Sequence, residues 1–173
     1  MNIEVVRAGS RDDTTLRNLY QFYIYEFTRF MTHWHVNYAG RFTEDDLDEV
    51  WYKPKRNTFL VKVDGELAGF AIVDHGVRGE YSDAPEIVLM VEFFVMAAFQ
   101  GQGIAEQVAI RLFDLYPGKW EVFELEKNVR AQRFWRRIIG RYTDGQYREA
   151  ASPDGKGVVQ FFDNSLKQQS SLQ

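Results

Sequence analysis

Apolar residues recur at spacings of three and four positions in three stretches of the chain, and this period predicts three long helices. The stretches cover residues 16–27, 105–116 and 131–139, and the last of these is expected to end at Gly140. A shorter acidic helix is expected over residues 43–51, which open with a Thr-x-x-Asp sequence resembling a capping box. The predicted helices are separated by segments of a different pattern.

Those segments are rich in β-branched and aromatic residues, which is typical of strands. Strands are expected over residues 3–7, 58–63, 67–75, 86–96, 119–125, 141–148 and 157–162. Asp64-Gly65 between two of them is a strong signal for a tight hairpin. The run 86–96 is apolar almost throughout, which indicates a central strand. The order of elements predicts one α/β domain over residues 1–163 and a polar tail over residues 164–173.

Composition narrows the classes of function. The chain has 173 residues and no cysteine, which excludes disulfides, a thiolate nucleophile and cysteine-based metal sites. Its net charge of −4 provides no global field for nucleic acid, so no nucleic-acid partner is expected. The start lacks the features of a signal peptide, and no apolar run reaches the roughly 18 residues of a membrane span. We therefore expect a cytoplasmic protein that binds neither a membrane nor a metal.

A glycine-rich segment, residues 100–105, joins the central strand to the second long helix. Gly101 and Gly103 permit an unusual backbone turn and leave no Cβ between the amides and a ligand. The N–H groups at the helix start favour an anion, so the segment predicts a site for a diphosphate-bearing ligand. A plain strand–helix turn would use the same glycines. A dinucleotide-binding fold, for which Glu124 or Glu126 has the required spacing, conflicts with the strand-rich first half.

The same segment, Gln100-Gly101-Gln102-Gly103-Ile104-Ala105 preceded by Val95, resembles the acetyl-CoA-binding signature of the GNAT superfamily of N-acetyltransferases. A second family motif, Asn-x-x-Ala-x-x-aromatic-Tyr, is matched by Asn128, Ala131, Phe134 and, in the tyrosine's place, Trp135. The runs PGKWEV and FWRRII resemble a bacterial subgroup of predicted acetyltransferases. The resemblance implies a mixed, mostly antiparallel sheet of six to seven strands with about four helices, splayed at an acetyl-CoA cleft.

The resemblance also implies a reaction and a set of ligand contacts. The acetyl group would pass directly from acetyl-CoA, the co-substrate, to a primary amine of a small molecule. Backbone groups of Phe94 and Val95 would pair with the pantetheine arm, and residues 100–105 would hold the pyrophosphate. Asn128 and Trp135 would border the same ligand, and one or two arginines of the last helix could meet its phosphates.

Glu92 is the candidate general base, because it is a carboxylate within an otherwise apolar strand, where burial favours proton uptake. A role at a polar rim or in an ion pair is the alternative, and Glu86 and Glu124 are weaker candidates for the base. An indole cannot act as a general acid, so Trp135 departs from the family's usual tyrosine. Another phenol such as Tyr142 would then replace it, or the thiolate would leave unassisted, or the domain would bind without catalysis.

Aromatic residues crowd the first third of the chain, and in the family this region walls the acceptor site. Most of them are expected to pack in the core, but Phe22 and Tyr25 lie off the main apolar stripe beside Glu26, which suits a cationic amine. The acidic run at residues 44–49 would either attract that amine or form a solvated helix face. Acetylation of a protein N-terminus or lysine, or non-catalytic acyl-CoA binding, are the alternative functions. Family members often form homodimers.

Overall fold

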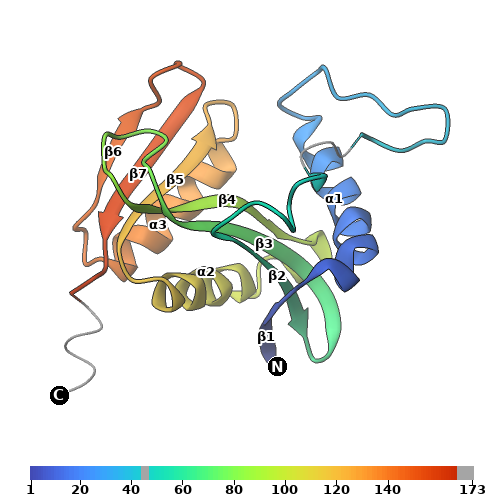
Figure 1. The fold of residues 1–173 in the computed structure, drawn as a ribbon, viewed down its shortest axis with the longest axis horizontal. Coiled ribbons are helices and arrows are strands. Elements are labelled where there is room, and N and C mark those ends of the chain that lie inside the picture. The colour runs from blue at the N-terminus through green and yellow to red at the C-terminus, as the bar shows by residue number, and fades with distance from the viewer. Residues whose placement is uncertain (44–46, 167–173) are drawn as a thin grey trace.

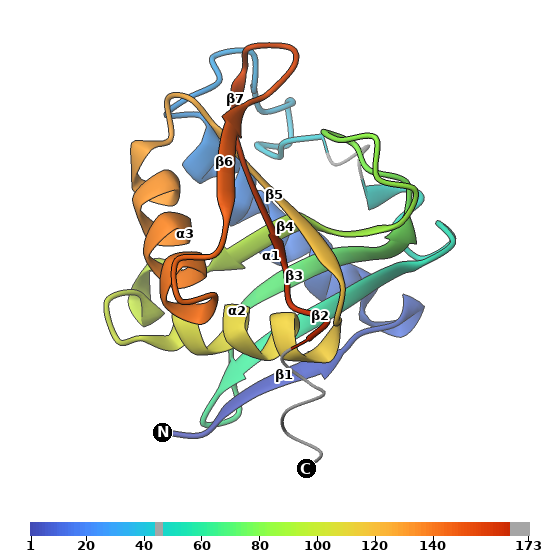
Figure 2. The same cartoon turned by 90° about the vertical axis from the view of Figure 1, so that its left-hand side faces the viewer.

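The computed structural model describes residues 1–43 and 47–166. Seven strands form one sheet in the order β1-β2-β3-β4-β5-β7-β6, in which every neighbouring pair is antiparallel except β4 and β5 (Figures 1 and 2). The strands are β1 (Ile3–Arg7), β2 (Arg56–Val63), β3 (Glu66–Val77), β4 (Ile87–Val95), β5 (Lys119–Leu125), β6 (Arg148–Ala151) and β7 (Gly157–Asp163). The α-helices are α1 (Asp13–Phe27), α2 (Ile104–Leu115) and α3 (Val129–Tyr142), and short 3-10 turns cover Ser10–Asp12 and Ala97–Phe99. The expected mixed, mostly antiparallel sheet is confirmed.

The local signals account for most element boundaries. Asp64 and Gly65 both have positive φ, 50° and 87°, as a two-residue hairpin turn of the primed type requires. Strand β4 lies in the middle of the sheet, as its apolar run predicts. Of the expected fourth helix at residues 43–51, residues 44–46 lie outside the described part, and residues 48–52 form turns.

One expected strand was wrongly placed. The segment 141–148 does not form a strand, because α3 continues past Gly140 to Tyr142 and the strand β6 begins only at Arg148. The helix ends where Asp144 and Gly145 adopt positive φ and the Gly145 N–H donates to the Gly140 carbonyl at 2.8 Å. Gly140 itself keeps a helical backbone, so the helix stop lies one turn later than the first glycine suggests.

The helices cover the sheet on both faces (Figure 1). Helices α2 and α3 pack on one face and enclose the larger core, which includes Phe113, Trp120 and Ile139. Helix α1 packs on the other face over Leu60, Phe70, Ile72 and Phe94. None of the helices in the described ranges is long and apolar enough to cross a membrane.

A bulge partway along β4 changes which of its side chains point to each face of the sheet. Opposite β3, Ile72 pairs with Glu92 but Val73 pairs with Met90, so Val91 is an extra residue that bulges from the ladder. Met90 belongs to the core on the α2–α3 face, whereas Phe94 belongs to the core under α1. Side chains alternate between the two faces along a strand. One inserted residue therefore turns every later side chain of the strand to the opposite face of the sheet. Glu92 and Phe94 therefore face α1.

The parallel pairing of β4 with β5 stops at the same place. Val88, Leu89 and Met90 pair with Trp120–Val122, and the two strands then separate although β4 continues to Val95 and β5 to Leu125. The far half of β4 is thus hydrogen-bonded to β3 alone. The expected splay of the sheet is confirmed, and it opens beside the glycine-rich turn.

A buried carboxyl group lies under α3 and gives the fold a testable pH dependence. Glu124 on β5 is 3% exposed, and burial raises its pKa from 4.5 to about 9, an effect that the neighbouring Gln160 amide only partly opposes. Between these values the folded state holds a proton that the unfolded state has released. The free energy of unfolding should therefore fall as pH rises through this range, by up to about 1.4 kcal/mol per pH unit.

We expect Glu124→Gln, which resembles the neutral acid, to remove this slope and to stabilise the protein at about pH 8 relative to the wild type. Urea unfolding between about pH 5.5 and about pH 8 measures the effect. Glu66→Gln, an exposed position on the β2–β3 hairpin, is the matched control and should leave the slope unchanged. An equal slope in Glu124→Gln and the wild type would contradict the assignment.

Candidate active site

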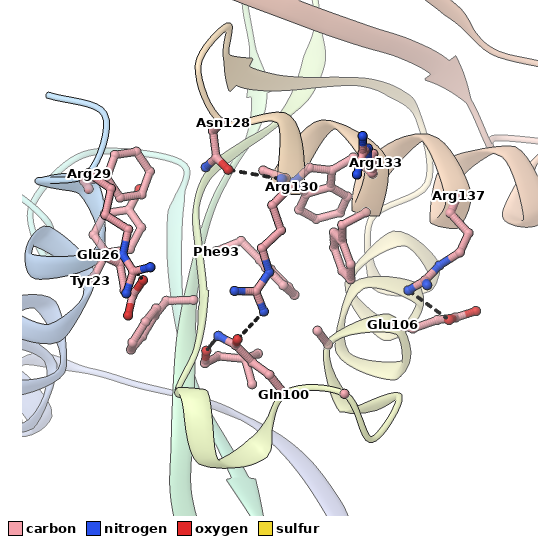
Figure 3. A pocket seen from close by; sticks show the side chains of 18 of the residues that line it. Tyr23, Glu26, Arg29, Phe93, Gln100, Glu106, Asn128, Arg130, Arg133 and Arg137 are labelled. Carbon is pink, nitrogen blue, oxygen red and sulfur yellow. Dashed lines mark hydrogen bonds and ion pairs between the residues drawn. The ribbon is translucent and has the colours of Figure 1, made fainter.

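A cleft of 620 Å³ opens where β4 and β5 separate, and it is lined by residues of α1 and the turn after it, β4, the glycine-rich turn, the start of α2, and α3 (Figure 3). Helix α1 and the turn after it form one wall, the end of β4 forms the floor, the glycine-rich turn forms one end, and α3 forms the opposite wall. The lining residues are Tyr23, Glu26, Phe27, Arg29, Phe30, Phe93, Phe94, Val95, Gln100, Gly101, Gly103, Ala105, Glu106, Asn128, Arg130, Ala131, Arg133, Phe134, Trp135 and Arg137.

The backbone at the end of β4 faces the cleft. The Met96 N–H donates to the Ala68 carbonyl at 2.8 Å, so the alternation of an antiparallel ladder turns the Val95 N–H and C=O away from β3. They point toward the gap that β5 has left. The Gln100 side-chain amide donates to the Val95 carbonyl at 2.7 Å, which fixes the glycine-rich turn to the strand end.

The glycine-rich turn leaves open space at the start of α2. Gly101 and Gly103 have φ of 78° and 75°, and a Cβ added at either one would meet no atom within 4 Å. Gly103 is the N-cap of α2, so the first N–H groups of the helix are directed toward this space. Ile104, by contrast, is buried in the core, and Gln102 is exposed and donates to the Ala98 carbonyl at 3.1 Å.

Three arginines of α3 face the cleft from the opposite wall. Arg130, Arg133 and Arg137 follow one another at helical spacings of three and four and are exposed. Figure 3 shows Arg130 reaching across to Gln100, to which its guanidinium donates. Arg137 lies 3.9 Å from Glu106 of α2. This wall is therefore rich in positive charge.

The inner part of the same wall is aromatic. Trp135 is 5% exposed and packs edge-on against Phe93 and Phe134, with ring centroids 5.0 and 4.9 Å apart. Asn128 caps α3 by accepting from the Ala131 N–H at 3.1 Å, and it also lines the cleft. The position where the family motif has a tyrosine is thus occupied by an indole inside the cleft.

On the α1 side of the cleft, the carboxylate of Glu92 is hydrogen-bonded to the lining residue Tyr23. Glu92 is half-buried and accepts hydrogen bonds from the phenols of Tyr23 and Tyr20, the latter at 3.4 Å. Tyr23 lines the cleft, whereas Glu92 and Tyr20 do not. Glu26, one turn after Tyr23, also lines the cleft and pairs with Arg29 at 3.2 Å.

Several residues singled out from the sequence lie elsewhere. Phe22 and Tyr25 are 56% and 61% exposed on α1 and do not line the cleft, so of the expected acceptor wall only Glu26 reaches it. Glu86 lies in a second hollow beside His75. Tyr142 lies outside the cleft, where its phenol donates to Asp114 at 2.7 Å, and burial raises its pKa to about 12. No group of three His, Cys, Asp or Glu side chains that could hold a metal occurs in the described ranges.

The cleft also contains residues to which sequence reasoning assigned no specific role. Tyr23 and Phe27 belong to the apolar stripe of α1, which predicts core residues, but both also line the cleft. Arg29 and Phe30 follow the helix end, and helical periodicity does not place them. A polar group on an apolar helix stripe, opposite a carboxylate on a neighbouring strand, is the signal that would have identified Tyr23.

The comparisons with known proteins agree with this geometry. The Acetyltransferase (GNAT) family matches residues 19–140. The search of curated proteins found no match. Among solved structures, an acetyltransferase from Thermus thermophilus is 16% identical with a TM-score of 0.64, covering 93% of this chain and 96% of its own. The aminoglycoside acetyltransferase AAC(6')-Ib in complex with coenzyme A is 16% identical with a TM-score of 0.66, covering 98% and 99%.

An N-acetyltransferase from Staphylococcus aureus is 14% identical with a TM-score of 0.60, covering 94% of this chain and 98% of its own. Identities at this level establish a common fold. The family match spans well over half of the 173 residues and includes β4, the glycine-rich turn and most of α3. The chain therefore belongs to the GNAT family of acetyltransferases.

Proposed function

We propose that this protein transfers an acetyl group from acetyl-CoA to the primary amine of a small molecule, within a complex that holds both substrates. The observation that carries the proposal is the position of the cleft. The cleft opens where β4 stops pairing with β5. A glycine turn with open space above it lies at one end, and a row of arginines lies along one wall. AAC(6')-Ib, which has the same fold, is described in complex with coenzyme A and kanamycin.

The residues of the cleft suit acetyl-CoA, which supplies the activated thioester. The open space above Gly101 and Gly103 would admit the pyrophosphate against the helix N-terminus, and Arg130, Arg133 and Arg137 would neutralise phosphate charge. The free edge of β4 would bind the pantetheine amides as an added strand would. Asn128 and Trp135 would border that arm.

Transfer of the acetyl group makes two further demands on the protein. The attacking amine must be neutral, and a primary amine is mostly protonated at neutral pH, so a base must accept a proton. The carbonyl oxygen gains charge as the tetrahedral intermediate forms and needs a fixed donor. The Val95 N–H faces the cleft and is the proposed donor, and Glu92 is the proposed base.

The α1 wall suggests the chemistry of the acceptor. Glu26 contributes a carboxylate to the cleft, and Tyr23, Phe27 and Phe30 contribute aromatic surfaces. A cation is attracted to both kinds of group. The acceptor is therefore proposed to carry a positive charge besides the amine that is acetylated, and Arg29 balances Glu26 until that acceptor binds.

A second candidate function is acyl-CoA binding without turnover. It is favoured by Trp135, which places an indole where the family motif has a phenol. Release of free thiol from acetyl-CoA across a panel of amines separates the two functions. Equal amounts of thiol and acetylated amine support the enzyme, and binding without thiol release supports the second candidate.

Gly103→Glu tests the site for the phosphates. A carboxylate would fill the open space and repel phosphate, so coenzyme A should bind about 100-fold more weakly, a loss of about 2.7 kcal/mol. Isothermal titration with coenzyme A measures the affinity. Gly40→Glu is the matched control, because Gly40 also has positive φ (72°) with open space around it but does not line the cleft.

The control should lose a similar amount of stability through backbone strain, roughly 1–2 kcal/mol, and keep its affinity for coenzyme A. If Gly103→Glu binds coenzyme A as tightly as Gly40→Glu does, the phosphates do not bind at this turn. The proposed position of the co-substrate would then be wrong.

Glu26→Gln tests the acceptor wall. Loss of this carboxylate should raise the KM for a cationic amine about tenfold and leave kcat within about twofold, because the group binds the amine but takes no part in the chemistry. Steady-state kinetics with a monocationic and a polycationic amine measure the effect. Glu66→Gln removes an equal charge far from the cleft, and a similar rise in KM for this control would show that only net charge matters.

A further inference from the structure

We infer that Tyr23 carries the proton between the acceptor amine and Glu92, so that the carboxylate acts through the phenol. This inference rests on the proposed acetyl transfer and adds a residue to it. Tyr23 lines the cleft and donates its phenolic proton to the Glu92 carboxylate. Glu92 does not line the cleft, so an amine bound in the cleft would reach the carboxylate through the phenol of Tyr23.

The position of the phenol is fixed by packing. The Tyr23 ring lies between three phenylalanines, with centroids 4.5 Å from Phe27, 5.6 Å from Phe70 and 5.9 Å from Phe94. Phe70 and Phe94 belong to paired strands of the central sheet, so α1 cannot rotate without breaking this core. Proton transfer requires a phenol in a fixed position, because the Glu92 carboxylate and the bound amine must both lie within hydrogen-bond distance of it at the same time.

The charges around Glu92 suit a proton acceptor. Tyr20 of α1 donates to it at 3.4 Å, and Arg56 of β2 is near enough for the negative charge of Glu92 to help raise the arginine pKa. Asp74 of β3 binds Arg56 through two hydrogen bonds of 2.7 and 2.8 Å and is the main cause of that rise. Glu92 therefore accepts from two phenols, Tyr20 and Tyr23, and lies near a cation, Arg56, that is paired with Asp74.

Lys53 adds a second positive charge 3.5 Å from Asp74. Asp74 is therefore neutralised by two cations. The Asp74 carboxylate, although it lies beside Arg56, therefore adds little net negative charge to this part of the sheet.

No other phenol can take this role within the described ranges. Tyr23 is the only tyrosine among the described lining residues. Tyr142 is held by Asp114 and Asn164 away from the cleft. Trp135, where the family motif has its tyrosine, has no acidic proton to exchange.

The relay balances protons over one turnover. The amine that attacks is the neutral form, whose ammonium proton has already passed to solvent. As the amine nitrogen bonds to the acetyl carbon, one of its remaining protons passes to the Tyr23 oxygen while the phenolic proton passes to Glu92. When the carbon–sulfur bond breaks, the phenol donates its proton to the departing sulfur and Glu92 returns its proton to the phenol. The amine has then exchanged one hydrogen for the acetyl group, the thiol has gained that hydrogen, and both side chains regain their starting states.

The test compares Tyr23→Phe, Glu92→Gln and the double variant, with Tyr142→Phe as a control that removes a phenol outside the cleft. The acceptor is whichever of kanamycin, spermidine and phenethylamine the wild type acetylates fastest. Each single variant should lower kcat by about 100-fold or more, and the double variant should be no slower than the slower single variant, because both residues serve one transfer. The dissociation constant of coenzyme A should stay within about twofold, since only proton transfer is removed.

A conservative replacement at position 23 distinguishes a role of Tyr23 in proton transfer from a role in packing. Difluorotyrosine at position 23 keeps the ring and the O–H but loses its proton more readily. The alkaline limb of the kcat–pH profile should therefore move to lower pH, which a purely packing role would not produce.

Four results would overturn the relay, and they are distinguishable. Full kcat in Tyr23→Phe with a large loss in Glu92→Gln would show that the carboxylate acts directly, and the proposed function would stand. Additive losses in the double variant would show two independent roles. An unmoved alkaline limb would show that Tyr23 acts through packing alone. Coenzyme A binding by the wild type with no acetylated amine would overturn the proposed function and the relay together.

Discussion

One inserted residue in the central strand organises the candidate site. The bulge at Val91 turns Glu92 and Phe94 toward α1 and lies next to the last residue that pairs β4 with β5. Without it, Glu92 would share a face with Met90 and would lie in the apolar core under α2 and α3. The point where β4 separates from β5 and the face of the sheet on which Glu92 lies are therefore set by neighbouring residues of one strand.

The cleft that results has two chemically different walls. Arg130, Arg133 and Arg137 on α3 give one wall a positive charge that suits phosphates, and Glu26 with the aromatic edges of α1 gives the other a character that suits a cation. A ligand with phosphates and a ligand with amines would thus be attracted to opposite sides of one space. Their reacting groups would meet above the end of β4, where the Val95 N–H faces the cleft.

Sequence patterns predicted the elements that depend on local chemistry. Strand β5 and the Asp64-Gly65 hairpin follow from residue type and spacing alone. The bulge at Val91 was not predictable, because an unbroken apolar run contains no mark of where a residue leaves the ladder. The acceptor wall depends on how α1 is rotated on the sheet. Periodicity identifies its apolar stripe, but packing against Phe70 and Phe94 decides that Tyr23 reaches the cleft and Tyr25 does not.

The central claim is that the gap between β4 and β5 holds acetyl-CoA in a position from which an amine can take the acetyl group. A backbone-amide NMR titration with acetyl-CoA and a cationic amine measures this most directly. Acetyl-CoA should shift the amide resonances of Val95 and of residues 101–105, the amine should shift those near Glu26, and acetylated amine should accumulate in the same tube. Shifts confined to the hollow beside His75, with no change at residues 101–105, would contradict the account.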